Sequence, residues 1–186
     1  MNQQKFSMKF LWLTAVTMFM IIGCRQADSE EGAGFISFQQ QSTGISFDYP
    51  EDWVQKELTR EILLASSQTS LDENQFHEAA GLVIFMEEQS VVGPDLEYFM
   101  RKYVIQDEMR YLTAIRPDKL EINGREAVGV KFSRPQGDLD AIIGVLLIQL
   151  EEDEGVIFVQ YVLDSTSEDE LLPQIDRIIE SIDVSS

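Results

Sequence analysis

Two neighbouring apolar segments, residues 141–150 and 156–163, place the strongest constraint on the fold of this chain. Each has the length of one strand, and neither alternates between apolar and polar residues, which predicts strands buried on both faces. The acidic segment 151–155 between them is short enough for a turn, so we expect the two strands to pair antiparallel. A sheet that is apolar on both faces needs a covering layer on each side.

Two amphipathic segments can supply these layers. The first begins near Pro94, where a proline and a neighbouring acid favour a helix start, and keeps helical spacing to about Met109. The C-terminal one has an apolar stripe made of Leu171, Leu172, Ile175, Ile178, Ile179 and Ile182. Ser167 and Glu170 have the spacing of a capping box, although Pro173 favours a start nearer Glu170. One helix on each face predicts an α+β fold, a three-layer α/β/α sandwich with a central antiparallel sheet.

Other segments predict shorter strands and one loop. Apolar and polar residues alternate from Ile45 to Tyr49, which is typical of a half-buried strand. Asn123-Gly124 is a strong hairpin signal that divides residues 120–132 into two strands. The polar segment 69–78 is expected to be a loop. Further short strands are expected at residues 54–58, 61–67 and 82–86.

The N-terminal residues have the layout of a secretory signal. Lys5 and Lys9 precede a short apolar run that ends just before Cys24, the only cysteine in the chain. A spanning helix needs about 20 apolar residues, so the run is short for an uncleaved anchor, which is the alternative. Residues 21–24, Ile-Ile-Gly-Cys, resemble the lipobox of bacterial lipoproteins. That resemblance implies cleavage before Cys24, a diacylglyceryl group on its sulfur, and possible further acylation of its amine by a fatty acid such as palmitate.

The predicted cleavage divides the chain into a signal peptide at 1–23, a lipidated tether at 24–34 and one domain at 35–186. All 33 acidic residues and 12 of the 14 basic ones follow the cut, so the mature chain has a formal charge of −21. Such a surface favours solubility and repels nucleic acid and anionic lipid head groups. We expect an extracytoplasmic protein on the cell membrane. The outer membrane is open if the organism has two membranes, because Arg25 is not the aspartate that retains lipoproteins in the inner one.

The acidic turn is the strongest candidate for a cation site. Calcium prefers several carboxylate oxygens, which four consecutive residues could offer: Glu151, Glu152, Asp153 and Glu154. Asp138 and Asp140 could add ligands if their loop lies at the same end of the sheet. The spacing is not that of an EF-hand loop, and adjacent side chains diverge. The alternative is a charged turn that keeps two very apolar strands soluble.

The sequence contains no recognisable catalytic constellation. His77 is the only histidine, and it lies in a polar segment where an exposed loop residue is expected. Lipidation of Cys24 would leave no free thiol nucleophile. Trp53, Phe99 and Tyr103 belong to apolar stripes and are expected in the core. We therefore predict a protein that is not an enzyme and that needs no cofactor, calcium excepted.

The segment 44–53, Gly-Ile-Ser-Phe-Asp-Tyr-Pro-Glu-Asp-Trp, resembles the start of PsbP-like and Mog1-like domains. The late pair of apolar strands and the final helix around residues 178–182 also resemble that group, and the similarity covers about residues 40–184. The resemblance implies the antiparallel α/β/α sandwich. In that group, plant PsbP supports calcium and chloride at photosystem II, cyanobacterial relatives are lipoproteins, and Mog1 binds a small GTPase. None of their functional residues can be placed on this chain.

Three functions remain open at this point. The first is a non-enzymatic binding or assembly-support module at a membrane surface, which follows from the tether and the single domain and implies a protein partner. The second is a PsbP-like accessory protein of photosystem II with calcium involvement. A hydrolase with an unrecognised site ranks behind both.

Overall fold

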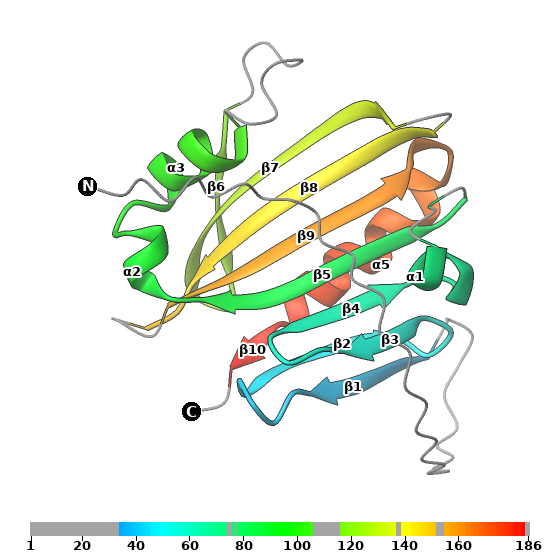
Figure 1. The fold of residues 1–186 in the computed structure, drawn as a ribbon, viewed down its shortest axis with the longest axis horizontal. Helices are drawn as coiled ribbons and strands as arrows, with labels where there is room; N and C mark the ends of the chain where they lie inside the picture. Colours follow the sequence, from blue (N-terminus) through cyan, green and yellow to red (C-terminus); the bar gives the residue numbers. More distant parts are fainter. Residues whose placement is uncertain are drawn as a thin grey trace. The chain divides into compact units, whose positions relative to one another are not determined.

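The two apolar segments form the centre of a seven-stranded antiparallel sheet, as β8 (Leu139–Gln149) and β9 (Val156–Asp164). Their register runs from Ala141 opposite Asp164 to Gln149 opposite Val156. The strand order is β3-β4-β5-β9-β8-β7-β6 (Figure 1). These features belong to a computed structural model that describes residues 34–73, 76, 78–105, 116–136, 139–151 and 155–184, all within one compact unit.

The remaining strands of this sheet confirm the sequence predictions closely. They are β3 (Val54–Glu57), β4 (Glu61–Ala65), β5 (Ala80–Glu87), β6 (Asp118–Ile122) and β7 (Arg125–Gln136). The hairpin between β6 and β7 turns at Asn123 and Gly124, whose φ angles are 51° and 76°. Two successive positive φ angles are what a type I′ turn requires, and Asn-Gly accepts them at low cost.

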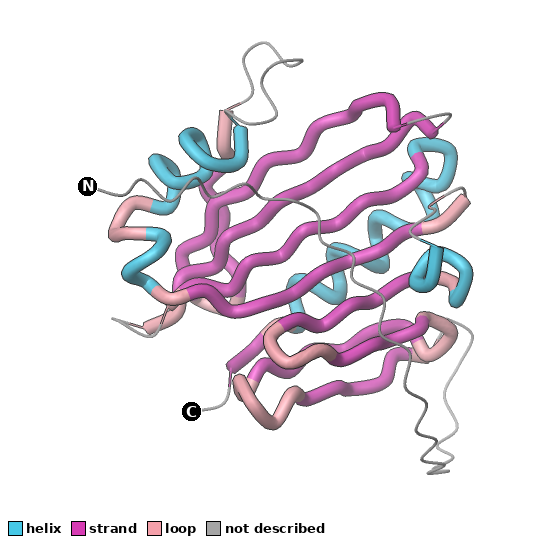
Figure 2. Tube along the Cα trace, viewed as in Figure 1, coloured by secondary structure: helices cyan, strands magenta, loops and turns pink. Residues whose placement is uncertain are grey.

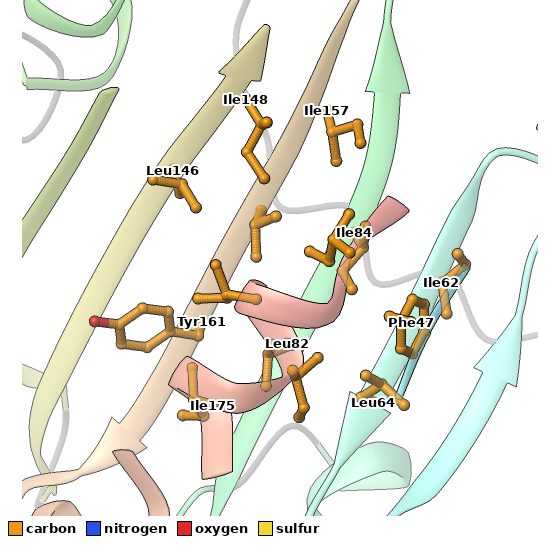
Figure 3. Packing of buried hydrophobic residues seen from close by; sticks show 14 of the residues in the cluster. Phe47, Ile62, Leu64, Leu82, Ile84, Leu146, Ile148, Ile157, Tyr161 and Ile175 are labelled. Carbon is orange, nitrogen blue, oxygen red and sulfur yellow. The ribbon is translucent and has the colours of Figure 1, made fainter. Parts of the chain in front are cut away.

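One face of the sheet is covered by α5 (Glu168–Ser181) and by a second, three-stranded sheet. Ile175 and Ile178 of α5 are fully buried there against Ile148, Ile157 and other alternate residues of the central strands. Figure 3 shows this packing around Ile175, Leu82 and Ile84. Burial of one such side chain contributes roughly 1.5–3 kcal/mol.

The second sheet consists of β1 (Phe35–Gln39), β2 (Ile45–Pro50) and β10 (Asp183–Val184), with β2 in the middle. Strand β2 confirms the strand predicted from Ile45 to Tyr49, and Phe47 packs near Ile62 and Leu64 of β4 (Figure 3). The pairing of β2 with strands on either side of it was not expected from the sequence. Together, α5 and this small sheet form one outer layer of the three-layer α/β/α sandwich, so the predicted fold class is confirmed.

The opposite face is covered by α2 (Gln89–Val92), α3 (Leu96–Phe99) and the π-helix η1 (Met100–Ile105). The predicted helix starting near Pro94 is confirmed over residues 96–105, where α3 continues directly into η1, although its second part is a π-helix. Gly93 has a φ of 79° and separates α2 from α3, and Figure 2 shows the two as separate turns. Asp95 starts α3 by accepting a hydrogen bond from the Tyr98 backbone N–H. The predicted end of the helix near residue 109 lies outside the described residues.

Two local predictions were also wrong. The segment 69–78, expected to be a loop, contains the helix α1 (Gln68–Glu73). The capping box of Ser167 and Glu170 does not form, because Ser167 makes no side-chain cap bond. The turn η2 (Ser165–Ser167) precedes α5 instead, and Asp164 caps it through the Thr166 N–H. Helix α5 therefore starts at Glu168 and contains Pro173, which leaves one carbonyl of its first turns without its usual partner.

The C-terminal end of α5 is tied to both sheets. The Asn123 side chain donates hydrogen bonds to the carbonyls of Glu180 (3.0 Å) and Ile182 (2.8 Å). The Ser181 hydroxyl accepts from the Asp48 backbone N–H at 2.8 Å. The two Asn123 bonds satisfy carbonyl groups at the end of the helix, and the Ser181 bond satisfies a backbone N–H of β2. Together the three bonds fix the end of α5 over the sheets. Among the described residues, no helix is long and apolar enough to cross a membrane.

Candidate functional site

The predicted cation site falls largely on residues that the structure does not describe. Glu151 is exposed at the end of β8, whereas Glu152, Asp153 and Glu154 lie outside the described residues. Asp140 lies at the start of β8, and Asp138 is outside the description. A strand rises about 3.3 Å per residue, so Asp140 is roughly 35 Å from Glu151. Asp140 and Glu151 therefore lie at opposite ends of β8 and cannot bind the same cation.

Of the other residues singled out in the sequence, some lie outside the described residues and some within them. Cys24 and His77 lie outside the described residues. Trp53 is buried as predicted, with its indole N–H donating to the Gln174 side chain at 3.0 Å. Phe99 is half-buried against the cluster under α3, and the Tyr103 side chain is not described. Within the described ranges, no three His, Cys, Asp or Glu side chains gather closely enough to hold a metal ion.

Tyr161 on β9 is a buried polar group with a strongly raised pKa. Its ring lies over Gly144 of the neighbouring strand β8, so that a Cβ atom placed on Gly144 would be 2.1 Å from the ring. Figure 3 shows the Tyr161 ring extending from β9 toward β8. Burial, together with the nearby carboxylates of Asp176 and Glu168, raises the pKa of Tyr161 to about 12. The phenol is thus held neutral at physiological pH.

Charged side chains surround this tyrosine at the border of α5 and β7. Lys131 forms an ion pair with Glu168 at 3.2 Å. Burial and the neighbouring Glu180 raise the pKa of Asp176, while Lys131 acts in the opposite direction. The side chains of Lys131, Glu168 and Asp176 are partly exposed to solvent. Together with Tyr161 they form a cluster in which a solvated ion network lies beside a buried ring.

The chemistry available to this cluster is limited. A general base for catalysis works best with a pKa near the operating pH, and a phenol near 12 is far from that value. The arrangement is suited to holding α5 against β7 and β9 through packing and charge.

Sequence reasoning missed this cluster, although one signal for it was present. Gly144 interrupts an otherwise bulky apolar strand, and a glycine inside a strand often marks a close approach by another group. The register then places Gly144 directly opposite Tyr161. Only the pairing of β8 with β9 shows that the Tyr161 ring occupies the space beside Gly144.

No protein-family model matches the sequence, and no curated protein matches it at the sequence level. Solved structures do match the fold. The Ran-binding protein Mog1p of Saccharomyces cerevisiae has 13% identity and a TM-score of 0.55, over 82% of this chain and 96% of that chain. The fold is Mog1/PsbP-like.

Two further solved structures share this fold. LpqN, involved in cell envelope biogenesis of Mycobacterium tuberculosis, has 13% identity and a TM-score of 0.54, over 82% of this chain and 91% of that chain. Cyanobacterial PsbP of Synechocystis sp. PCC 6803 has 12% identity and a TM-score of 0.50, over 87% of this chain and 98% of that chain. At such low identities the likeness concerns the fold, which this chain shares with a Ran-binding protein and with an envelope-biogenesis protein.

Proposed function

We propose that this chain is an exported lipoprotein that holds a non-enzymatic binding or assembly-support domain at a membrane surface. The observation that carries the proposal is the position of Cys24. It is the only cysteine, it follows the apolar run directly, and it precedes the first strand by only eleven residues. Two or three acyl chains at this point would hold the domain firmly, since one chain alone binds only marginally.

The fold supports the binding part of the proposal. A Mog1/PsbP-like sandwich is the architecture of a Ran-binding protein and of an envelope-biogenesis protein. The cluster around Tyr161 is suited to packing, since a phenol with a pKa of about 12 is a poor general base near pH 7. A rigid domain on a short tether would present its surface to a protein partner at the same membrane.

Lipidation can be tested directly on the full chain. Cells that produce the protein are fed an alkyne analogue of palmitate, and membranes are separated from soluble material. We expect label and membrane location in the natural chain and loss of the label in Cys24→Ala. Gly23→Leu is the matched variant, because a bulky residue before the cut should block the peptidase and leave an uncleaved chain. Equal labelling of Cys24→Ala and the natural chain would contradict the proposal.

The partner can be sought with the same lipidated chain. Gentle crosslinking in native membranes, followed by purification, should recover a specific protein with the natural chain and far less of it with Cys24→Ala. Recovery of no protein from membranes that contain the labelled lipoprotein would count against a binding role.

A second candidate is support of photosystem II with calcium, which the likeness to cyanobacterial PsbP favours. Calcium titration of the mature chain by calorimetry tests its cation part. Binding should be weakened when Glu152 and Glu154 are changed to glutamine. The absence of a heat signal at about 1 mM calcium, the affinity range of weak extracellular sites, would remove calcium from the proposal.

A further inference from the structure

The edge strands of the two sheets differ in charge. Among the described residues, four strands lie at sheet edges: β1, β3, β6 and β10. Strand β6 contains Asp118, Lys119 and Glu121, β3 contains a lysine and a glutamate, and β10 has only two residues, one of them an aspartate. Strand β1, Phe-Ile-Ser-Phe-Gln, has no charge at all. Charges on edge strands prevent pairing with other chains, and β1 lacks this protection in a very acidic protein.

The backbone of β1 also offers bonding groups on its outer side. The Gly34 carbonyl accepts from the Glu51 N–H at 2.7 Å, and the Gln40 N–H donates to the Ile45 carbonyl at 2.8 Å. Both bonds run along the β2 side of the strand. Because N–H and C=O groups alternate in direction along a strand, Phe35 and Ser37 direct theirs away from β2. Figure 1 shows β1 as the outer strand of this sheet.

An exposed apolar side chain lies between these two residues. Ile36 is 41% exposed, one of few large apolar side chains in the described structure with that much contact with water. We propose that β1 pairs antiparallel with β1 of a second copy of this chain, about a two-fold axis at Ile36. In that register Phe35 lies opposite the second copy's Ser37. Phe35 and Ser37 of each strand then exchange four backbone hydrogen bonds across the axis.

The register also buries the exposed isoleucine. Ile36 and the second copy's Ile36 form a non-hydrogen-bonded pair, in which the Cα atoms are about 4.5 Å apart and the side chains touch. A two-fold contact of this kind is self-complementary and closed, so it forms a dimer and not a fibre.

The charge of the protein permits this contact. Two described acids lie close to this strand: Asp48 on β2, which accepts a hydrogen bond from the Ser37 hydroxyl, and Glu51, whose carboxylate lies beside Gly34. Strands in a sheet lie about 4.8 Å apart, so the backbones of the two Asp48 residues, like the two Gly34 residues, would be about 14 Å apart. That exceeds the Debye length of about 8 Å at physiological ionic strength, and their repulsion is largely screened.

The tether makes a second copy the fitting occupant, a step that rests on the proposed lipid anchor. Residues 25–33 span at most about 30 Å, and they end beside β1. In the antiparallel pair the two Gly34 residues would be only about 14 Å apart along the strands, so both tethers reach one membrane. A pair of five-residue strands buries too little area for a tight dimer in solution. Confinement to one membrane raises the effective concentration and compensates for that.

Cysteine crosslinking in native membranes tests the pairing. Ile36→Cys in the full chain places two thiols across the axis at a Cα separation that a disulfide spans. Leu120→Cys is the matched control, since Leu120 is 46% exposed on the charged edge strand β6. We expect about tenfold more disulfide-linked dimer from Ile36→Cys than from Leu120→Cys, given the raised local concentration. The chain without an added cysteine measures any background from Cys24.

A second substitution separates backbone pairing from chance collision. Ser37→Pro removes an N–H that points away from β2, and an edge strand tolerates proline on that side. The crosslink of Ile36→Cys should fall to the Leu120→Cys level with Ser37→Pro and should persist with Ser37→Ala, which controls for the hydroxyl bond to Asp48. Palmitate labelling of the same samples reports the anchor separately, and a chain held only by its apolar run still allows the comparison. Equal dimer from Ile36→Cys and Leu120→Cys would overturn the proposed pairing, whatever the label shows.

Discussion

The two faces of the central sheet are covered in different ways. One face has a single 14-residue helix, α5, whose Ile175 and Ile178 are fully buried. The other has the four-residue helix α2 and, after Gly93, a shorter helical segment in which α3 continues directly into η1. A long helix is held at many positions along its length, whereas shorter helical segments beside a glycine turn can shift more easily. The α5 face should therefore be the less tolerant of the two.

The largest effect is expected from truncation in the α5 face. Ile175→Ala should lower the free energy of unfolding by about 4 kcal/mol, because α5 cannot move in to fill the space. Leu96→Ala in α3 should cost roughly half as much, since Leu96 is the first residue of its helix and the chain beside the Gly93 turn can relax into the cavity. Urea unfolding of the two variants measures the difference. An equal cost at both sites would refute the contrast between the faces.

A close approach under α5 sharpens the same contrast. Gly144→Ala should cost about 2–3 kcal/mol, because its methyl group would collide with the Tyr161 ring. Gly129→Ala on the same face should cost less, since the nearest atom to its new Cβ is a Leu146 methyl at 3.1 Å. The double variant Gly144→Ala with Tyr161→Leu should recover part of the loss. Strict additivity in this double-mutant cycle would show that the ring is not the obstacle.

The ends of the two helical layers can be compared through their polar contacts. Asn123→Ala should cost about 1–2 kcal/mol. It removes two hydrogen bonds to the end of α5, and alanine tolerates the positive φ angle of this turn position less well than asparagine does. Asp95→Ala removes one cap bond of α3 and should cost about 1 kcal/mol or less. Thermal unfolding of both variants provides the ranking, and a larger loss for Asp95→Ala would reverse it.

The smallest effect concerns pH and the outer side of α5. The folded-state pKa of Asp176 is raised, so its ionisation above that pKa lowers stability, and the penalty disappears as the pH falls through the raised value toward 3.8. Asp176→Asn should therefore stabilise the protein at pH 7, by less than about 1 kcal/mol because the group is largely solvated. The gain should be absent near pH 3. A stabilisation that is the same at both pH values would point to a cause other than ionisation.

Most strands and the fold class were predictable because they depend on local pattern. Residues 141–150 and 156–163 are apolar on both faces, which requires cover on both sides, and the short segment 151–155 between them allows only antiparallel pairing. Asn123-Gly124 determined its turn because few dipeptides accept two positive φ angles. The C-terminal helix followed from the spacing of its isoleucines, although its cap did not, since the turn η2, capped by Asp164, precedes it and Ser167 makes no side-chain cap bond.

The candidate sites were less predictable, for a physical reason. Whether Asp140 can join Glu151 depends on which end of β8 each occupies, and the length of that strand separates them. The meeting of Tyr161 with Gly144, and of Lys131 with Glu168, depends on register and on the placement of α5. Contacts between distant segments carry no periodicity that a sequence pattern could show.

By itself, the sequence determined that this chain has a lipobox-like Cys24, a strongly acidic domain, and two central strands that need cover on both faces. Only the tertiary structure decided that β2 pairs with β1 and β10 in a separate sheet, and that β1 is an uncharged edge strand with Ile36 exposed. Composition and periodicity report how each residue prefers to be solvated. Which strand is left at an edge depends on pairing between segments more than a hundred residues apart, such as β2 and β10.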